Sequence, residues 1–470
     1  MTSTLKSPRL RRIIGAYTVN RLGTWFGFVA LLVAVFDHTH SALAVAGLLI
    51  AGQALPAFAA PALAARIEAS PRRGTLSGLY VFEGVATAAL AVLLWHFSLP
   101  AILLLVALDG TAALAASALL RAETAHAARE QAREDHVEEQ DGKDLETFEQ
   151  ATERQANATL NIAFSATCML GPAIAGVVVA AAGAPAALFI DAASFLICGA
   201  MLLDLYPHAE GAEEISVRSR MRAAWLHVNA VLALRTLLLA EAIALVFFNS
   251  ADPIEVAYAK TTLHVGDRGY GLLLAAWGVG VVIGSLVFAR SPKRGLGTML
   301  TCGTFAMGLA YIGFAVAPSL QVACVAAVLG GVGNGVEWAS VISLVQRLTS
   351  PAMHGRLMSA VESIGALSLA LGPALGGLLV ALSSPRAAFL VVGIGATAMT
   401  LVFLKLVLDG LDRRTSEDAQ RPDAQDLSAE PGDASAPGPA TLVQVGAAAP
   451  IPAREHLKSD ATSVVKYDKD

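Results

Sequence analysis

The fold class is decided by one apolar stretch, Thr167-Cys-Met-Leu-Gly-Pro-Ala-Ile-Ala-Gly-Val-Val-Val-Ala-Ala-Ala-Gly183. Gly171 and Pro172 lie inside it, and Gly176 follows the proline by four residues. In a water-soluble helix a central Gly-Pro pair would be a defect, because proline removes a backbone donor and glycine lowers helix propensity. In a bilayer the pair is tolerated, since neighbouring helices re-satisfy the freed carbonyl and small residues allow close packing. The stretch therefore predicts a transmembrane helix.

The composition also indicates an integral membrane protein. Hydrophobic residues make up 55% of the chain and charged residues only 15%, and the mean hydropathy is +0.60. A soluble domain does not need this much apolar surface to fill its core. The low aromatic content, 6%, together with 41 glycines favours packed helices over barrel strands. We expect an all-α membrane protein that spans a lipid bilayer, with no metal, no other cofactor and no nucleic-acid partner.

A helical span needs about 20 apolar residues. Lys and Arg gather on one side of the resulting topology, starting with the basic N-terminal residues, so both termini are expected to be cytoplasmic. Twelve segments qualify as spans: 13–36, 42–65, 75–97, 99–120, 158–182, 186–206, 235–258, 269–289, 296–317, 320–345, 357–382 and 386–408.

The chain contains an internal repeat. Ser70-Pro-Arg-Arg-Gly74, between the second and third spans, matches Ser291-Pro-Lys-Arg-Gly295, between the eighth and ninth. The Gly-Pro pattern of the fifth span recurs in the eleventh as Gly372-Pro-Ala-Leu-Gly-Gly377. The repeat predicts twelve transmembrane helices in two parallel six-helix halves.

These boundaries predict a domain organisation. An amphipathic pattern over 217–233 predicts an interfacial helix in the linker, and the polar composition after the last span predicts a disordered tail. The expected parts are a cytoplasmic N-terminus at 1–12, a first bundle at 13–206 with an acidic cytoplasmic insertion at 121–155, a linker at 207–234, a second bundle at 235–408 and a cytoplasmic tail at 409–470.

Several motifs resemble the major facilitator superfamily, specifically its bacterial enterobactin-exporter-like and macrolide-efflux-like branch. The resemblance covers roughly 13–408, and it implies alternating access between two rocking halves, usually with export driven by proton entry. It also implies a bacterial cytoplasmic membrane. The motifs are Gly171-Pro-Ala-Ile-Ala-Gly176, Asp191-Ala-Ala-Ser-Phe-Leu196, Gly271-Leu-Leu-Leu-Ala-Ala-Trp-Gly-Val-Gly280, Gly330-Gly-Val-Gly-Asn-Gly335, Gln346 and His354-Gly-Arg-Leu-Met-Ser359.

The sequence departs from the family pattern at three places. Ala65 stands where the family's loop motif usually has aspartate, and Thr24 where relatives often carry an acid. The arginine often found within the fourth span is absent, because Arg121 only reaches its cytoplasmic end. If the protein is a proton antiporter, its proton carrier must therefore lie elsewhere.

Acidic residues inside the spans are the candidate proton sites. An ionisable group near the bilayer centre costs about 2.5–3.5 kcal/mol on insertion scales, so each one requires an explanation. An acid could carry the coupling proton, or it could pair with a donor and only hold the bundle together. Glu255 shares one face of the seventh span with two candidates, and Asp191 and Glu362 favour the structural alternative. The proton-coupling candidates are Asp109, Glu241, Glu337, Glu83 and Asp252.

Three further groups could act in transport. Arg21 could attract an anionic substrate, or it could snorkel or pair with an acid. The glycine and proline positions could be hinges or close-packing sites, and the basic loops could be orientation signals or a latch. The cavity candidates are Arg21, Trp25, Asn334 and Trp338; the hinge candidates are Gly171, Pro172, Gly176, Gly372, Pro373 and Gly376; the loop candidates are Arg66, Arg72, Arg73, Arg290, Lys293 and Arg294.

No motif indicates an enzyme. Gly278-Val-Gly-Val-Val-Ile-Gly284 lies inside a span without a preceding strand, so helix packing explains it better than nucleotide binding. Asp37-His38-Thr39-His40 is interpreted as polar capping rather than a metal site. We expect a monomeric, proton-coupled exporter of small amphipathic molecules of the drug, macrolide or siderophore type. An uptake symporter or facilitator, and a non-transporting membrane sensor or scaffold, are the alternatives.

Overall fold

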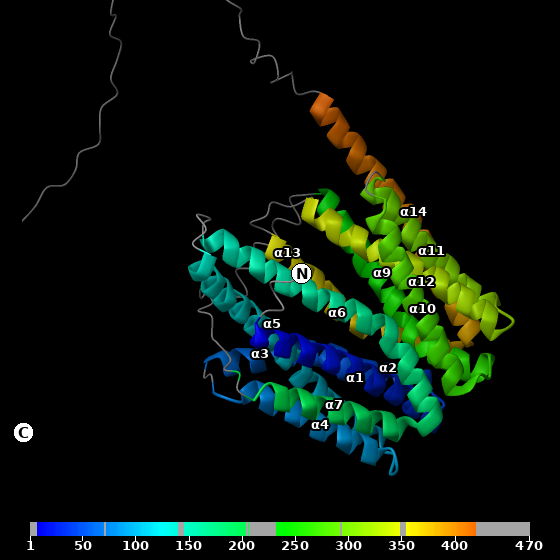
Figure 1. Ribbon diagram of the computed structural model, residues 1–470. Helices are drawn as coiled ribbons and strands as arrows, with labels where there is room; N and C mark the ends of the chain where they lie inside the picture. The colour runs from blue at the N-terminus through cyan, green and yellow to red at the C-terminus, as the bar shows by residue number, and fades with distance from the viewer. Residues whose placement is uncertain are drawn as a thin grey trace, which may run out of the picture. The chain divides into compact units, whose positions relative to one another are not determined.

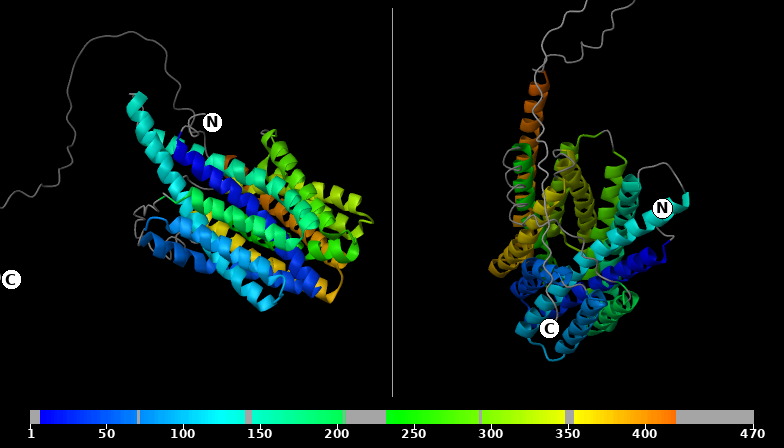
Figure 2. Two further views of the ribbon diagram at one scale, coloured as in Figure 1. Left: turned by 60° about the horizontal axis from the view of Figure 1, so that its bottom comes forward. Right: turned by 90° about the vertical axis from the view of Figure 1, so that its left-hand side faces the viewer.

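The computed structural model describes residues 7–69, 72–139, 145–203, 205, 232–291, 294–347 and 354–419. Their secondary structure consists of helices and the turns between them. Contacts divide the chain into a unit Met1–Ser416 and a unit Glu417–Asp470. Figures 1 and 2 show how the helices of the first unit are arranged.

The first half of this unit contains six helical regions. The second region is assembled from two α-helices joined by a π-helix, which run on from one another as one membrane-length segment. The elements are α1 Pro8–Thr39, α2 Ala42–Leu49, η1 Ile50–Ala54, α3 Leu55–Ala69, α4 Thr75–Leu93, α5 Leu99–Glu139, α6 Leu145–Ala182 and α7 Ala184–Met201.

The second half has the same number of helical regions among the described residues. Here a π-helix extends the first of them at its C-terminal end, as one continuous segment. The elements are α9 Leu232–Ala257, η2 Tyr258–Thr262, α10 Gly266–Ala289, α11 Leu296–Val316, α12 Leu320–Arg347, α13 His354–Leu382 and α14 Pro385–Ala419.

Each predicted span coincides with one of these helical regions. Among the described residues, ten helices are long and apolar enough to cross a membrane by length and composition. The other two predicted spans lie in α6 and α13, whose shorter apolar parts are Leu170–Ala182 and Leu367–Leu382. The predicted all-helical membrane fold is confirmed.

The charged insertion at 121–155 is largely helical. It continues α5 to Glu139 and begins α6 at Leu145. Ion pairs between described side chains join these extensions, Arg129 with Glu153 at 3.4 Å and Arg133 with Glu149 at 2.7 Å. The described part of the insertion therefore lengthens two spans as a paired helical extension.

Other predicted segments lie wholly or partly outside the described residues. These are residues 1–6, most of the linker with nearly all of its predicted interfacial helix, and the tail from 420 onward. Helix α14 runs to Ala419, past the predicted end of the last span at 408.

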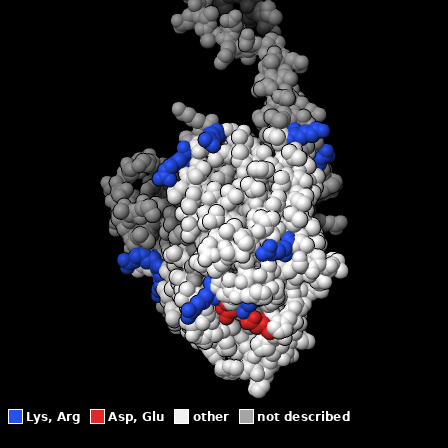
Figure 3. All heavy atoms as spheres, turned by 90° about the vertical axis from the view of Figure 1, so that its right-hand side faces the viewer, with Lys and Arg blue, Asp and Glu red and all other residues white. Residues whose placement is uncertain are grey.

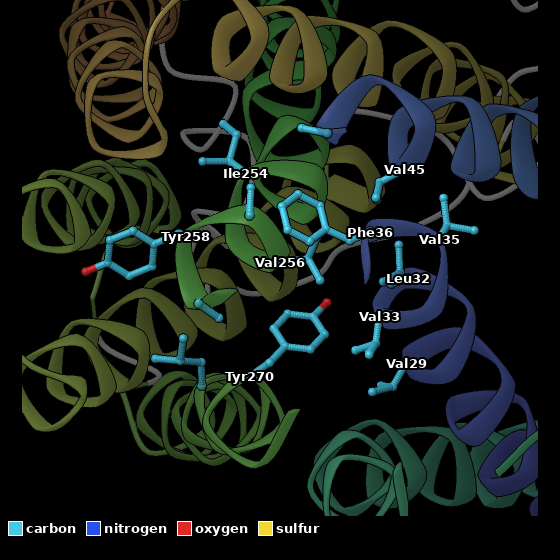
Figure 4. Close-up of a cluster of buried hydrophobic side chains, with 14 of the residues drawn as sticks. Val29, Leu32, Val33, Val35, Phe36, Val45, Ile254, Val256, Tyr258 and Tyr270 are labelled. Atoms are coloured by element: carbon cyan, nitrogen blue, oxygen red, sulfur yellow. The ribbon is translucent and has the colours of Figure 1, made fainter. Parts of the chain in front are cut away.

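The two halves share an apolar core at one end. We call this the outer end, following the predicted topology; it holds the α1–α2 and η2–α10 turns. Figure 4 shows side chains of α1 and α2 facing those of α9, η2 and α10, with Phe36 opposite Val256 and Tyr270. At the inner end, the described residues form separate cores, one around Leu10 and Leu119 of the first half and one around Leu300 and Phe403 of the second. The halves are thus packed together at the outer end.

Glycines allow the close approach of the halves. A Cβ added at Gly176 of α6 would lie 2.2 Å from the Cα of Gly271 of α10. A Cβ at Gly377 of α13 would lie 3.0 Å from the carbonyl oxygen of Ala42 of α2. Since both contacts join backbone to backbone, only glycine fits at these positions without a shift.

Candidate functional site

Three acids of the first half form one group. Glu83 of α4 is 1% exposed, and the charges of Asp109 of α5 and Asp191 of α7 act on it. Glu83 Oε1 and Asp109 Oδ1 are buried without a hydrogen-bond partner among the described residues. The structure thus brings two predicted proton sites together with an acid that the sequence assigned to a structural role.

Asp191 contacts α1 directly. A Cβ at Gly27 would lie 2.2 Å from Asp191 Oδ2, and one at Gly23 would lie 2.8 Å from Oδ1. Ser194 Oγ lies 3.4 Å from Oδ1. The carboxylate therefore fits into a notch that two glycines one helical turn apart leave on α1.

Two acids of the second half form a pair across helices. Glu241 of α9 is 1% exposed and Glu337 of α12 is 6% exposed, and the charge of Glu337 acts on Glu241. Thr304 Oγ1 of α11 donates a hydrogen bond of 3.4 Å to Glu337 Oε1. Glu241 Oε2 is buried and has no hydrogen-bond partner among the described residues. The electrostatic effect of Glu337 on Glu241 thus links two predicted proton sites.

The remaining acids of α9 form a second location on the same helix. Asp252 lies 11 residues after Glu241, which corresponds to about 16 Å along the axis. Asp252 and the buried Glu255 lie near the aromatic side chains of Tyr270 and Tyr311, on which their charges act. The predicted acidic face of the seventh span therefore contains two separate sites.

The predicted hinge positions make different contacts. Helices α6 and α13 continue through Pro172 and Pro373. Gly171 lies against the Trp25 side chain of α1, and Gly372 lies against Asn249 of α9. Both of these contacts stay within one half.

Gly176 and Gly376 differ in this respect. Gly176 meets Gly271 of the other half, whereas Gly376 packs on Ser250 of its own half. Gly377, which the sequence analysis did not single out, is the glycine of α13 that crosses between the halves. It lies 201 positions after Gly176, the same spacing that separates Gly171 from Gly372. This constant spacing is the signal that could have found it.

The cavity candidates lie on one helix of each half. Arg21 lies over the Tyr17 ring, 5.5 Å from its centroid, and its Nε donates a hydrogen bond of 3.4 Å to the Tyr17 hydroxyl. Trp25, one turn further along α1, packs edge-on against Phe28. On α12, Asn334 is half-buried and Trp338 is 49% exposed.

The basic loop candidates lie at the inner end. Arg66 is in the last turn of α3, and Arg72 and Arg73 precede α4. Arg290 caps α10 and Arg294 precedes α11, while Lys293 is outside the described residues, as is the side chain of Glu362.

No metal centre is found in the described part of the chain, and the histidines near the end of α1 make packing and backbone contacts. No group of three or more His, Cys, Asp and Glu side chains there could hold a metal ion. His38 stacks on Phe97 with centroids 4.3 Å apart, and His40 ends α1 in a left-handed conformation.

Comparison with known proteins identifies the family. The model of the Major Facilitator Superfamily matches residues 237–463. The fold is similar to that of the nucleoside transporter NupG in a D323A mutant, with a TM-score of 0.65 over 84% of this chain and 99% of that chain, at 14% identity. Residues 237–463 match the superfamily in sequence, and the fold of the first unit is that of its transporters. Both the match and the fold are those of multi-pass secondary transporters.

Two bacterial structures show the same superfamily fold. A bacterial homologue of the iron transporter ferroportin, in an inward-facing state, gives a TM-score of 0.63 over 85% of this chain and 99% of that chain, at 18% identity. A bacterial homologue of the human lysosomal transporter Spinster, inward-facing and unoccupied, gives 0.63 over 89% and 100%, at 13% identity. No curated protein matches this transporter in sequence. At these identities the solved structures indicate the fold alone.

Proposed function

We propose that this transporter exports small amphipathic molecules in exchange for protons. The observation that carries the proposal is the pair Glu241 and Glu337, two carboxylates on different helices that are 1% and 6% exposed. Neither takes part in an ion pair among the described residues. An anionic carboxylate buried without a cation is costly, so such a group is most stable with a proton bound.

Proton release would then require a change in the surroundings of the pair. Alternating access supplies such a change, because a rocking motion of the halves admits water to one end and then to the other. The shared outer core and the separate inner cores are what an inward-facing conformation needs. The pair lies on α9 and α12, within the second half.

The acids of the first half are a second proton site in this proposal. Glu83 and Asp109 both have buried oxygens without described partners. Asp191, which fits between Gly23 and Gly27, gives this group a direct contact with α1. A change in charge at this site would therefore act on α1, the helix that also carries Arg21 and Trp25.

The substrate class and the membrane follow from the sequence resemblance. The proposal includes substrates of the drug, macrolide or siderophore type and the enterobactin-exporter-like and macrolide-efflux-like branch. It also includes a bacterial cytoplasmic membrane and a monomeric state. Aromatic side chains on α1 and α12, including Trp25 and Trp338, suit amphipathic molecules.

An uptake symporter would use the same acids with the opposite direction of substrate movement, and a facilitator would not need them. The experiment that separates these functions is flux in proteoliposomes under an imposed proton gradient, using a panel of fluorescent amphipathic dyes. Wild type would be compared with Asp109→Asn and Glu241→Gln, and with Glu130→Gln in the exposed helical extension as a control.

Export in exchange for protons predicts that dye moves against the direction of proton flow. It also predicts that Asp109→Asn or Glu241→Gln abolishes the dependence of dye flux on the gradient, and that Glu130→Gln leaves it unchanged. Dye flux that follows the proton flow would instead establish uptake. If neither membrane acid alters gradient-driven flux, the proton-site assignment is wrong.

A further inference from the structure

Asp37 and Lys260 occupy corresponding positions in the two halves. Asp37 lies two residues before Thr39, the last residue of α1, and Lys260 lies two residues before Thr262, the last residue of η2. The two positions are separated by 223 residues, as are the two helix ends. The first helical region of each half thus carries a charged residue two positions before its end, and the two charges are opposite.

The two side chains form an ion pair across the halves. Lys260 Nζ lies 2.8 Å from Asp37 Oδ1 and 3.0 Å from Oδ2, and it also pairs with Asp267 in the first turn of α10. The Lys260 side chain is only 15% exposed. An exposed ion pair contributes little, because water screens it. The Asp37 and Asp267 side chains are 46% and 27% exposed, so the protection from water comes from the low exposure of the lysine and from the two carboxylates that share it. Acidic surface in Figure 3 lies directly beside basic surface on an otherwise mainly uncharged face.

The local backbone fixes the lysine in place. Lys260 lies in the π-helix η2, a rare helical form that occurs often at functional sites. The following turn contains His264 and Gly266 at φ values of 54° and 63°, in the left-handed region. This turn returns the chain so that Asp267 lies beside Lys260.

The ion pair lies at the same end as the shared apolar core. Phe36, next to Asp37, belongs to that core, as does Tyr258, two residues before Lys260. In Figure 4 these two side chains lie on either side of Val256. Outward opening would have to separate the α1 and η2 ends and expose this core, so it would also have to break the ion pair.

We propose that Asp37, Lys260 and Asp267 form an outer lock, which stabilises the closed outer end and must open once in each transport cycle. The proposal rests on alternating access in the proposed function. It assigns Lys260 a positioning role that is separate from the buried acids.

The test measures how often the outer end opens. Val256 is fully buried in the shared core, so Val256→Cys reacts with an external, membrane-impermeant maleimide only after opening. The four native cysteines would first be replaced. Labelling in cells would be compared for Lys260→Ala, for Asp37→Lys, and for Asp37→Lys combined with Lys260→Asp. Arg268→Ala, which removes a neighbouring exposed cation, is the control.

An outer lock predicts labelling about fivefold faster in Lys260→Ala. Asp37→Lys should also label faster, Arg268→Ala should match the parent, and the double exchange should return to within about twofold of it, since the opposite charges meet again. Equal labelling of Lys260→Ala and Arg268→Ala would overturn the lock. So would a double exchange that labels as fast as the single variants.

A second measurement holds the outer end closed and does not remove the ion pair to weaken it. Asp37→Cys with Lys260→Cys would be joined by a short, reducible bis-thiosulfonate cross-linker in proteoliposomes. The lock predicts that dye flux stops on cross-linking and returns on reduction, whereas unchanged flux would contradict it. If the variants label as predicted but the parent shows no proton-driven dye flux, the proposed function is wrong and the outer lock is still supported.

Discussion

At the residue scale, the interior of this transporter combines acids with glycines. Asp191 is buried because Gly23 and Gly27 leave space for its carboxylate. The sequence indicates that Asp191 lies within a span, and it favours a structural role. It does not show which helix receives the side chain, since that depends on how α1 and α7 pack.

This contact predicts the effect of Gly27→Ala. The added methyl group would lie 2.2 Å from Asp191 Oδ2, and overpacking of this kind destabilises a protein by about 1–3 kcal/mol. Gly78→Ala on α4 is the matched control, because a Cβ there meets nothing within 4 Å. Thermal unfolding in detergent should show a lower midpoint for Gly27→Ala only. Equal midpoints would mean that the notch is not filled as described.

The pair Glu241 and Glu337 makes a second prediction at this scale. If the pair only held the bundle together through hydrogen bonds to a charged carboxylate, Glu241→Gln would lower stability, because the neutral amide accepts weaker hydrogen bonds. If it carries protons, the neutral amide imitates the protonated acid and stability should be unchanged or higher. Unfolding midpoints of Glu241→Gln, Glu337→Gln and the double variant distinguish these outcomes, and a loss of about 2 kcal/mol in either single variant would favour the structural role.

At the scale of elements, the sequence predicted the helices well and their contacts poorly. Span length and hydropathy are local properties, so each predicted span coincides with a helical region of the structure. Gly176 and Gly376 are both hinge candidates by sequence. The structure shows that Gly377 crosses the halves instead, and a one-residue difference of this kind turns a helix face by about 100°.

The α6–α10 contact therefore predicts a conformational effect of Gly176→Ala. A methyl group 2.2 Å from the Cα of Gly271 cannot be accommodated without moving the helices apart. Because the contact exists only when the outer end is closed, the outer-open population should rise by about tenfold. External labelling of Val256→Cys reports it, and Gly365→Ala, with open space around its Cβ, is the control. Slower or unchanged labelling would show that α6 and α10 do not separate.

At the scale of the whole molecule, the repeat predicted two halves, but it could not predict which end of them is closed. Both halves carry the same Gly-Pro pattern, and the charge asymmetry only orients the spans. The closed outer end depends on contacts between segments far apart in sequence, such as Asp37 with Lys260 and Gly176 with Gly271. Asp37 was interpreted from the sequence as polar capping and Lys260 was not a candidate, because each is a charged residue at a span end.

The contact pattern also bears on whether the C-terminal tail takes part in transport. Contacts divide the chain between Ser416 and Glu417, and α14 ends at Ala419. Because the proposed proton sites and the proposed outer lock all lie before Ser416, transport should not need residues 420–470. We therefore expect the truncated protein to keep dye flux per molecule within about twofold of the full chain, with Glu241→Gln as the inactive comparison. A sensor or scaffold that signals through its tail requires the opposite. Truncated protein that folds and inserts but has lost its gradient-driven flux would show that the tail is part of the mechanism.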